Sequence, residues 1–301
     1  MSVVQLLIDV MGPVVAIVAV GWFAGARMPF EIATLSRLAF WVLGPAFVFD
    51  AFITAELSRD TIVRLVVAAW LGMAAAAAVG FAAARAAGLQ GVRRDAILMT
   101  SAYGNVGNAG LAISVFAFGE AAAPIAAVLM ITINSTGMAV AIALASARSD
   151  GLAPAVKRSL AAPMTVAALA ALLINVFDIG VPLLIGRSTA LVGGALIPVM
   201  LLTLGMQLAQ NGIPRPEIDA GVVGLSKLVV APLVAGLAGA AFGLTGDAWG
   251  ILVLQSAMPP AVFCVVVALE YDMEPDRVIR TVVGSTLLAL ATLPIALLVV
   301  T

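Results

Sequence analysis

Hydrophobic residues dominate the chain in long runs that are separated by short polar connections. A helix that spans a bilayer needs about 20 mostly apolar residues, and the sequence holds ten runs of roughly that length. The runs cover residues 4–26, 35–53, 62–87, 95–118, 121–147, 159–177, 188–210, 218–242, 247–269 and 277–300. We therefore expect an all-α polytopic membrane protein with ten transmembrane helices and no inserted soluble domain.

The composition supports a membrane protein and excludes several kinds of chemistry. Hydrophobic residues make up 63% of the 301 residues and charged residues only 10%, whereas soluble domains carry about 25% charged residues. There is no histidine, so His-based metal sites and a Ser-His-Asp triad are excluded. The single cysteine, Cys264, cannot form a disulfide within the chain. We expect no enzyme activity and no bound metal.

The positions of the basic residues predict the orientation in the membrane. Loops that face the cytoplasm carry an excess of Lys and Arg. The loops after the odd-numbered runs hold Arg27, Arg37, Arg85, Arg93, Arg94, Arg148, Lys157, Arg158, Arg215, Arg277 and Arg280. The opposite side holds Arg59, Arg64 and Arg187. We expect a multi-pass protein of the cell (plasma or inner) membrane with both termini outside.

The fourth run contains a stretch, residues 102–110, that does not suit a continuous helix. It reads Ala-Tyr-Gly-Asn-Val-Gly-Asn-Ala-Gly, and each glycine inside a helix costs about 1 kcal/mol relative to alanine. Backbone groups freed in a membrane must line a cavity or be buried in protein. The stretch therefore predicts either a helix broken within the membrane, as in secondary transporters, or a glycine-rich face for close helix packing.

Landmarks recur at an offset of about half the chain. Pro13 matches Pro163, Pro45 matches Pro198, Ser101 matches Ser256 and Ser135 matches Ser285. These matches predict that a five-helix unit is duplicated, with repeats at residues 1–150 and 151–301. Because five is odd, the second copy enters the membrane from the other side. This is the inverted repeat of many transporters.

The repeat places Pro259 and Pro260 in the ninth run opposite the glycine-rich stretch. A proline pair removes two backbone donors and interrupts a helix. Two broken helices would then cross, and the N-termini of their half-helices would offer N–H groups to a carboxylate. We expect the substrate-binding residues to include Asn105, Gly107 and Asn108 in the fourth run, together with Pro259 and Pro260.

These residues resemble a known family. Asn105 to Leu111 (Asn-Val-Gly-Asn-Ala-Gly-Leu), followed by Phe-Gly-Glu at 118–120, is similar to the fourth-helix signature of the auxin efflux carrier (PIN-like) family. The segments 256–260, 268–271 and 284–288 resemble the C-terminal half of the same family. Where the family motif usually continues with proline, this chain has Ala112, so its first break rests on glycines alone.

The resemblance implies a fold and a function. It implies ten helices in two inverted repeats, with helices 1, 2, 6 and 7 as a scaffold and helices 3–5 and 8–10 as a transport unit that carries broken helices 4 and 9. It also implies a homodimer formed through the scaffold, elevator-type motion and small organic anions as substrates. Those substrates are auxin in plants, and malonate, malate or similar carboxylates for bacterial members.

Lys227 is the one basic residue deep inside an apolar run. Ionisable groups inside the membrane are costly, and they mark functional sites by default. Lys227 is therefore expected in the substrate-binding region, where its charge balances a substrate carboxylate or replaces a coupling cation. The alternatives are that it reaches the membrane interface or pairs with a nearby carboxylate.

Further polar residues within the runs are candidates for ion or proton coupling. Ser135 and the amide of Asn134 could provide oxygen ligands to substrate or Na⁺, although Ser135 and Thr136 equally suit helix packing. Gln255 precedes the second break, and Asp50 is either a proton-titrating group or an interfacial carboxylate. No cofactor is expected beyond a coupling ion, H⁺ or Na⁺. The acidic residues of the segment 270–276 lack the spacing of a calcium-binding loop and are expected to be solvated.

The leading hypothesis is a secondary transporter for small organic anions. A sodium-coupled symporter of the bile-acid type shares the ten-helix plan, but the ninth run offers Gln255 and no acid before Glu270. A membrane-embedded enzyme is a weaker alternative, because the sequence has neither a catalytic motif nor paired acids within the membrane. No ATP-binding loop is present, so this chain alone is not a primary pump.

Overall fold

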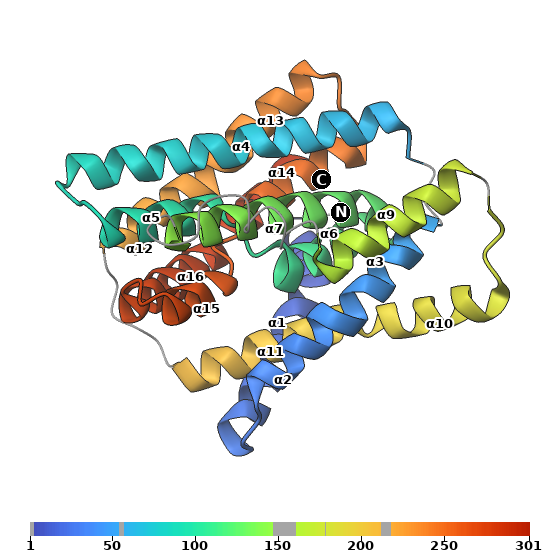
Figure 1. Ribbon diagram of the computed structural model, residues 1–301, viewed down its shortest axis with the longest axis horizontal. Coiled ribbons are helices and arrows are strands. Elements are labelled where there is room, and N and C mark those ends of the chain that lie inside the picture. The colour runs from blue at the N-terminus through green and yellow to red at the C-terminus, as the bar shows by residue number, and fades with distance from the viewer. Residues whose placement is uncertain (1–2, 54–56, 147–160, 178, 212–217) are drawn as a thin grey trace. The chain divides into compact units, whose positions relative to one another are not determined.

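The computed structural model of the chain describes residues 3–53, 57–146, 161–177, 179–211 and 218–301 (Figure 1). Helices make up most of this described part, and no strand occurs in it apart from one isolated bridge. The helices are α1 Val3–Arg27, α2 Ile32–Leu38, α3 Gly44–Ile53, α4 Arg59–Ala86, α5 Val92–Ala102, α6 Leu111–Phe118, α7 Ala123–Ser146, α9 Pro163–Val176, α10 Leu183–Gly194, α11 Leu196–Asn211, α12 Ile218–Gly224, α13 Ala231–Ala241, α14 Gly246–Ser256, α15 Phe263–Glu270 and α16 Pro275–Val300. Short π-helical segments at Ala39–Leu43, Val106–Gly110 and Leu225–Val230 and a 3₁₀ turn at Glu120–Ala122 complete the described elements.

The helices form two compact units. Unit 1 comprises Met1–Ser58, Gly107–Ala127 and Leu160–Gly212, and unit 2 comprises Arg59–Val106, Val128–Ser159 and Ile213–Thr301. Each unit is therefore assembled from parts of both halves of the sequence.

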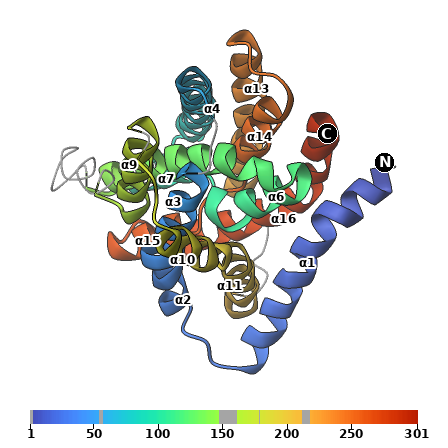
Figure 2. The same cartoon turned by 90° about the vertical axis from the view of Figure 1, so that its right-hand side faces the viewer.

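Unit 1 is organised around a close crossing of α1 and α11. A Cβ at Gly21 would lie 2.2 Å from the carbonyl oxygen of Leu202, and a Cβ at Gly205 would lie 2.0 Å from that of Val18. Only glycine fits at such distances, so the two backbones touch directly. Small residues at membrane helix interfaces permit this approach. Figure 2 shows the length of α1.

The rest of unit 1 packs on α3. Helices α9 and α10 both lie against α3. A Cβ added at Gly193 of α10 would lie only 2.6 Å from the α-carbon of Phe47. The amide of Asn175 donates to the carbonyl oxygen of Phe52 at 3.1 Å. This bond gives a carbonyl at the C-terminal end of α3 a partner.

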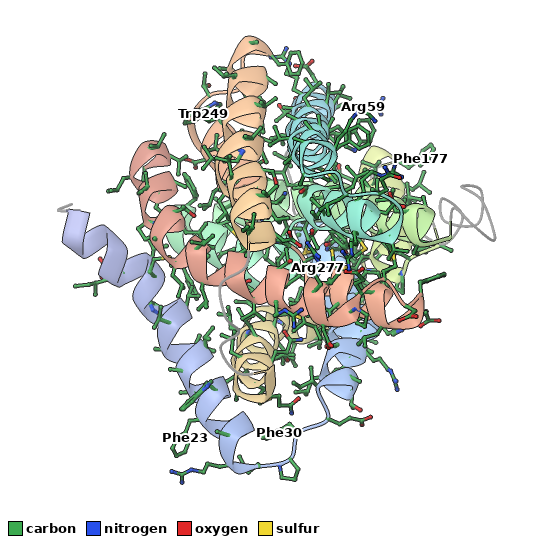
Figure 3. All side chains as sticks on the ribbon, turned by 90° about the vertical axis from the view of Figure 1, so that its left-hand side faces the viewer. Phe23, Phe30, Arg59, Phe177, Trp249 and Arg277 are labelled. Carbon is green, nitrogen blue, oxygen red and sulfur yellow. The ribbon has the colours of Figure 1, made fainter. Side chains whose placement is uncertain are left out.

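In unit 2, α4, α13 and α14 pack side by side. A Cβ at Gly72 of α4 would lie 2.8 Å from the carbonyl oxygen of Ala231, so α4 and α13 are in close contact. The indole N–H of Trp249, labelled in Figure 3, donates to the carbonyl oxygen of Gly236 at 2.9 Å and joins α14 to α13. Helix α16 lies against α12, α14 and α15.

Seven helical stretches of the described part are long and apolar enough to cross a membrane: Ile8–Arg27, Ile32–Ile53, Arg59–Ala86, Glu120–Ala145, Leu183–Gln210, Ile218–Ala241 and Pro275–Val300. Each overlaps one predicted run. The sixth run contains the shorter helix α9, and the fourth and ninth runs are each divided into two shorter helices. The all-helical class is confirmed, while the count of ten spans and the inverted repeat stay predictions.

Several predicted boundaries differ from the structure. The seventh run begins at Leu183 rather than at residue 188, and it is divided at Ala195, where α10 gives way to α11. Gly193 and Gly194 end α10, which agrees with the low helix propensity of glycine. The predicted boundary between repeats, at 150/151, lies outside the described residues, as do Arg148, Lys157, Arg158 and Arg215 of the basic loops.

Candidate functional site

The first interruption lies where the glycine-rich stretch begins. Helix α5 ends at Ala102, Tyr103 adopts an extended backbone conformation, and helical structure resumes at Val106 with a π-helical turn that leads into α6. Gly104 and Asn105 therefore lie in the non-helical gap, and both are buried. Thus the chain leaves the helix without a proline at this point.

The second interruption lies at the proline pair. Helix α14 ends at Ser256 and α15 begins at Phe263, so Pro259 and Pro260 stand in the middle of the gap. Proline has no N–H and disfavours a helical conformation in the preceding residue. The pair therefore accounts for a gap that is longer than the first.

The two gaps pair with each other inside unit 2. The N–H of Asn105 donates to the carbonyl oxygen of Pro259 at 2.7 Å, and the N–H of Ala261 donates to that of Tyr103 at 2.9 Å. Between these bonds, Gly104 faces Pro260 in an antiparallel bridge. This is the non-hydrogen-bonded position of an antiparallel pair, so the missing N–H of proline leaves no bond unmade.

The start of α15 carries backbone donors next to this pairing. The N–H groups of Cys264 and Val265 donate to the carbonyl oxygens of Ala261 and Val262 at 3.1 and 2.9 Å. The N–H groups of Val262 and Phe263 donate to no backbone carbonyl among the described residues. These two amides lie at the positive end of a short helix, where anions are stabilised.

Lys227 reaches the first gap from a neighbouring helix. It lies on the π-helical segment Leu225–Val230, between α12 and α13, and only 1% of its surface is exposed. A Cβ at Gly104 would lie 3.0 Å from its Nζ and 3.3 Å from its Cε. The amine therefore sits beside the backbone of Gly104 and does not reach an interface. No described carboxylate forms an ion pair with it.

An aromatic contact fixes the residue that precedes Gly104. The ring of Tyr103 lies against Gly137 of α7, whose Cβ would be 2.3 Å from Cδ2 of the ring. On another side the ring meets Phe263 in a tilted arrangement, with centroids 6.1 Å apart. Tyr103 thus joins α7 to the beginning of α15. No residue larger than glycine fits at position 137 without displacing the ring.

A buried pair of hydroxyls lies next to the same gap. The Oγ atoms of Ser226 and Ser101 are hydrogen-bonded at 3.2 Å, and Ser226 also donates to the carbonyl oxygen of Val223. Ser101 fills the space beside Gly80 of α4, where a Cβ would lie 2.3 Å from Oγ. The end of α5 is thus held between α4 and the segment that carries Lys227.

The predicted site residues divide into three sets. Asn105, Pro259, Pro260 and Lys227 come together at the paired gaps of unit 2, and Gln255, which is fully buried, lies on the last turn of α14. Asn134 and Ser135 lie partly buried on α7 of unit 2. Gly107 and Asn108 follow on the π-helical turn Val106–Gly110, and the side chain of Asn108 lies outside the described part. Asp50 lies elsewhere, on α3 of unit 1.

The acidic segment 270–276 combines exposed carboxylates with one ion-paired residue. Glu270, Asp272 and Asp276 are exposed, but Glu274 accepts from the Nε of Arg93 at 2.7 Å and lies 3.8 Å from Arg277. The ion pair with Arg93 is exposed, so it is compatible with the expected solvated loop. A side-chain partner 181 residues away leaves no local pattern in the sequence.

Two arrangements were missed by reading the sequence. Arg277 holds the carboxylate of Asp219 with two nitrogen atoms, Nε and Nη2, and so ties the start of α16 to the start of α12. The contact of Lys227 with Gly104 was also not foreseen. The sequence marks Gly104 and Lys227 separately, as a glycine and a lysine inside apolar runs. Only the fold brings positions 104 and 227 together.

Comparison with known proteins finds similarity to membrane transporters. The family described as "Membrane transport protein" matches residues 152–297. A protein of Rhizobium meliloti named "Putative malonate transporter" is 28% identical over 199 residues, which cover 64% of this chain and 62% of the relative. Auxin efflux carrier component 1 of Arabidopsis thaliana is 31% identical over 124 residues, or 40% of this chain and 20% of the relative.

A third relative, from Methanothermobacter thermautotrophicus, is named "Uncharacterized transporter" and is 29% identical over 110 residues, 36% of each chain. The matched parts cover less than two thirds of each relative's length. The names indicate transporters and not enzymes, and the long apolar helices make this a multi-pass membrane protein. These matches agree with the resemblance that the sequence predicted: the chain is similar to auxin efflux carrier component 1, and its C-terminal part is similar to the family described as membrane transport protein.

Proposed function

We propose that this chain is a secondary transporter of small organic anions, either carboxylates or auxin-like acids. The observation that carries the proposal is the pairing of Gly104 with Pro260, which brings two interrupted helices together at one place in unit 2. Secondary transporters bind substrate at such discontinuous helices. A relative named for malonate and another named for auxin support an acid as the substrate.

The residues at the gaps suit a carboxylate. The amides of Val262 and Phe263, at the start of α15, donate to its oxygens, and the side-chain amide of Asn105 adds a donor next to the gap. Lys227 contributes a positive charge close by. Asn134 on α7 and Gly107 and Asn108, just after Asn105, complete the proposed substrate-binding set, with Pro259 and Pro260 keeping the second gap open.

The proposed cycle is alternating access of the elevator type. Helices 3–5 and 8–10 form the predicted transport unit, and unit 2 gathers α4, α5, most of α7 and α12–α16, which cover most of those runs. The predicted scaffold of helices 1, 2, 6 and 7 corresponds to helices of unit 1, and a homodimer through the scaffold is part of the proposal. Ser135, Gln255 and Asp50 are the proposed residues for coupling to H⁺ or Na⁺.

Uptake into proteoliposomes tests the substrate class and the driving ion together. Labelled malonate, malate and indole-3-acetate are offered to the purified protein with no gradient, with an imposed H⁺ gradient and with an imposed Na⁺ gradient. We expect saturable uptake of at least one acid. Strict dependence on Na⁺ would instead favour the sodium-coupled symporter, and no uptake or binding of any acid would refute the anion hypothesis.

The variant Asn105→Ala tests the site. We expect its uptake to fall by about tenfold or more, because a neutral hydrogen bond at a site is worth about 1 kcal/mol and one to a charged group about twice that. Asn175→Ala is the matched control, since it removes an asparagine amide from unit 1 instead. Uptake by Asn105→Ala equal to that of the unmodified protein, with equal thermal stability, would contradict the role of the gap.

A further inference from the structure

We infer that Lys227 acts as a built-in cation that compensates the carbonyl end of the first interrupted helix, α5, so that, of the two candidate coupling ions, Na⁺ is not needed for anion transport by this chain. The inference rests on the proposed function only where it concerns transport. Its structural part, the compensation of the end of α5 by one ammonium group, stands on the geometry of unit 2.

The position of Lys227 is the first argument. Its side chain is among the largest that are fully buried, and its Nζ lies beside Gly104 in the first gap. The π-helical segment Leu225–Val230 carries it there, and single π-helical turns inside α-helices occur often at functional sites. A buried charge persists in a membrane only when other groups compensate it.

The compensating group is the end of α5. A helix carries about half an elementary negative charge at its C-terminus, and α5 ends at Ala102, just before Gly104. The segment Leu225–Val230 contacts this end, where Ser226 is hydrogen-bonded to Ser101 at 3.2 Å, and Nζ of Lys227 lies beside Gly104. The ammonium group therefore lies at the negative end of α5, which agrees with the lack of an ion-pair partner for Lys227 among the described carboxylates.

This assignment separates two tasks at the gaps. Lys227 compensates the carbonyl end of α5 permanently, and the start of α15, with the amides of Val262 and Phe263, remains positive toward a substrate carboxylate. A carrier without a fixed cation at this place would need a mobile cation for the first task in every cycle. Lys227 is thus a positioning residue that makes the site ready for an anion alone.

The experiment compares Lys227→Ala with the unmodified protein in media that contain Na⁺, K⁺, choline or ethylammonium as the main cation. Ethylammonium is the probe because it restores an ammonium group to the space that the lysine side chain leaves. We expect the unmodified protein to transport equally in all four media. We expect Lys227→Ala to lose about tenfold or more in uptake, as for the loss of a bond to a charged group, and to recover a measurable part of it in ethylammonium or Na⁺ only.

Two further variants sharpen the test. Gly104→Ala keeps the charge but pushes Nζ away from the gap, so its uptake should fall without recovery in any cation. Ser226→Ala, next to Lys227 on the same segment, keeps the charge in place and should show no cation dependence. Melting temperatures of all variants are measured in the same four media, without substrate.

The outcomes distinguish the inference from the proposed function. Restored thermal stability of Lys227→Ala in ethylammonium supports the charge role even if no acid is transported. Transport by Lys227→Ala that equals the unmodified protein, or that stays equally low in all four media together with an unchanged melting temperature, overturns the inference while the proposed function stands. A requirement of the unmodified protein for Na⁺ also overturns it.

Discussion

Gly137 shows how strongly single residues shape the candidate site. Its α-carbon lies so close to the ring of Tyr103 that a methyl group would meet Cδ2 at 2.3 Å. Tyr103 in turn provides the carbonyl that binds the N–H of Ala261 across the paired gaps. The position of this ring, and with it the pairing of the gaps, therefore depends on the absence of a side chain on α7.

Gly137→Ala should displace Tyr103 and disturb the gap. We expect a loss of unfolding free energy of about 1–3 kcal/mol, the usual cost of overpacking, with a fall in uptake. Thermal unfolding and proteoliposome uptake measure the two effects. Gly221→Ala on α12 is the control, because its methyl group meets nothing within 4 Å and alanine favours a helix. Equal behaviour of the two variants would refute the argument.

Reading the sequence succeeded best for residues that break local rules. Gly104 and Asn105 within an apolar run, and Pro259 with Pro260 in another, indicated interrupted helices, because glycine and proline act through the local backbone. Lys227 stood out for its charge. Its neighbour was not predictable, because the contact with Gly104 depends on how α5 and the segment Leu225–Val230 pack.

At the scale of elements, the ends of α12 and α16 are joined by charge. The bidentate contact of Arg277 with Asp219 is largely buried, whereas the pair of Arg93 with Glu274 is more exposed. Exposed ion pairs contribute about 0–1 kcal/mol, while breaking a buried pair costs about 3–5 kcal/mol. The first contact should therefore matter more for keeping α16 in place.

Asp219→Asn tests this ranking. We expect it to lower the free energy of unfolding by about 2–4 kcal/mol, because it leaves Arg277 facing a neutral amide. Arg93→Gln removes the more exposed pair and should cost less than about 1 kcal/mol. Denaturant unfolding in detergent compares the two variants. A larger loss in Arg93→Gln than in Asp219→Asn would reverse the proposed order.

Elements were predicted well in kind and less well in their limits. The seventh run was expected as one helix, but α10 and α11 meet at Ala195, where Gly193 lies against the backbone of Phe47. Hydropathy reports which residues prefer an apolar environment, and both sides of this division are apolar. A division inside an apolar run becomes visible only through the packing partner.

At the scale of the whole molecule, the distribution of basic residues makes a prediction of its own. With both termini outside, the loop around Gln90 faces the cytoplasm and the loop around Gly180 faces outward. In a Cys264→Ala background, Gly180→Cys should react with an impermeant maleimide on intact cells, and Gln90→Cys only after permeabilisation. Both positions are exposed, so the comparison is matched. The opposite labelling pattern would invert the assigned orientation.

The arrangement of the whole chain was only partly predictable. The offset matches, such as Pro13 with Pro163, predicted a duplicated unit, and the two compact units each draw helices from both halves of the sequence. Which helices share a unit depends on contacts such as that of Gly21 with Leu202. Glycine-rich helices offer many such pairings, and the sequence alone does not choose among them.

The burial of Lys227 also constrains how the protein is made. A lysine at the centre of a membrane helix costs about 3 kcal/mol for insertion of that helix alone. Its polar surroundings at Gly104 belong to a segment that is synthesised more than a hundred residues earlier. The stretch Ile218–Ala241, although long and apolar enough to span, is therefore a weaker membrane anchor by itself than the same stretch without the lysine would be. It should enter the bilayer late, guided by N-terminal helices that are already in place, so the order of synthesis is itself part of how this fold is reached.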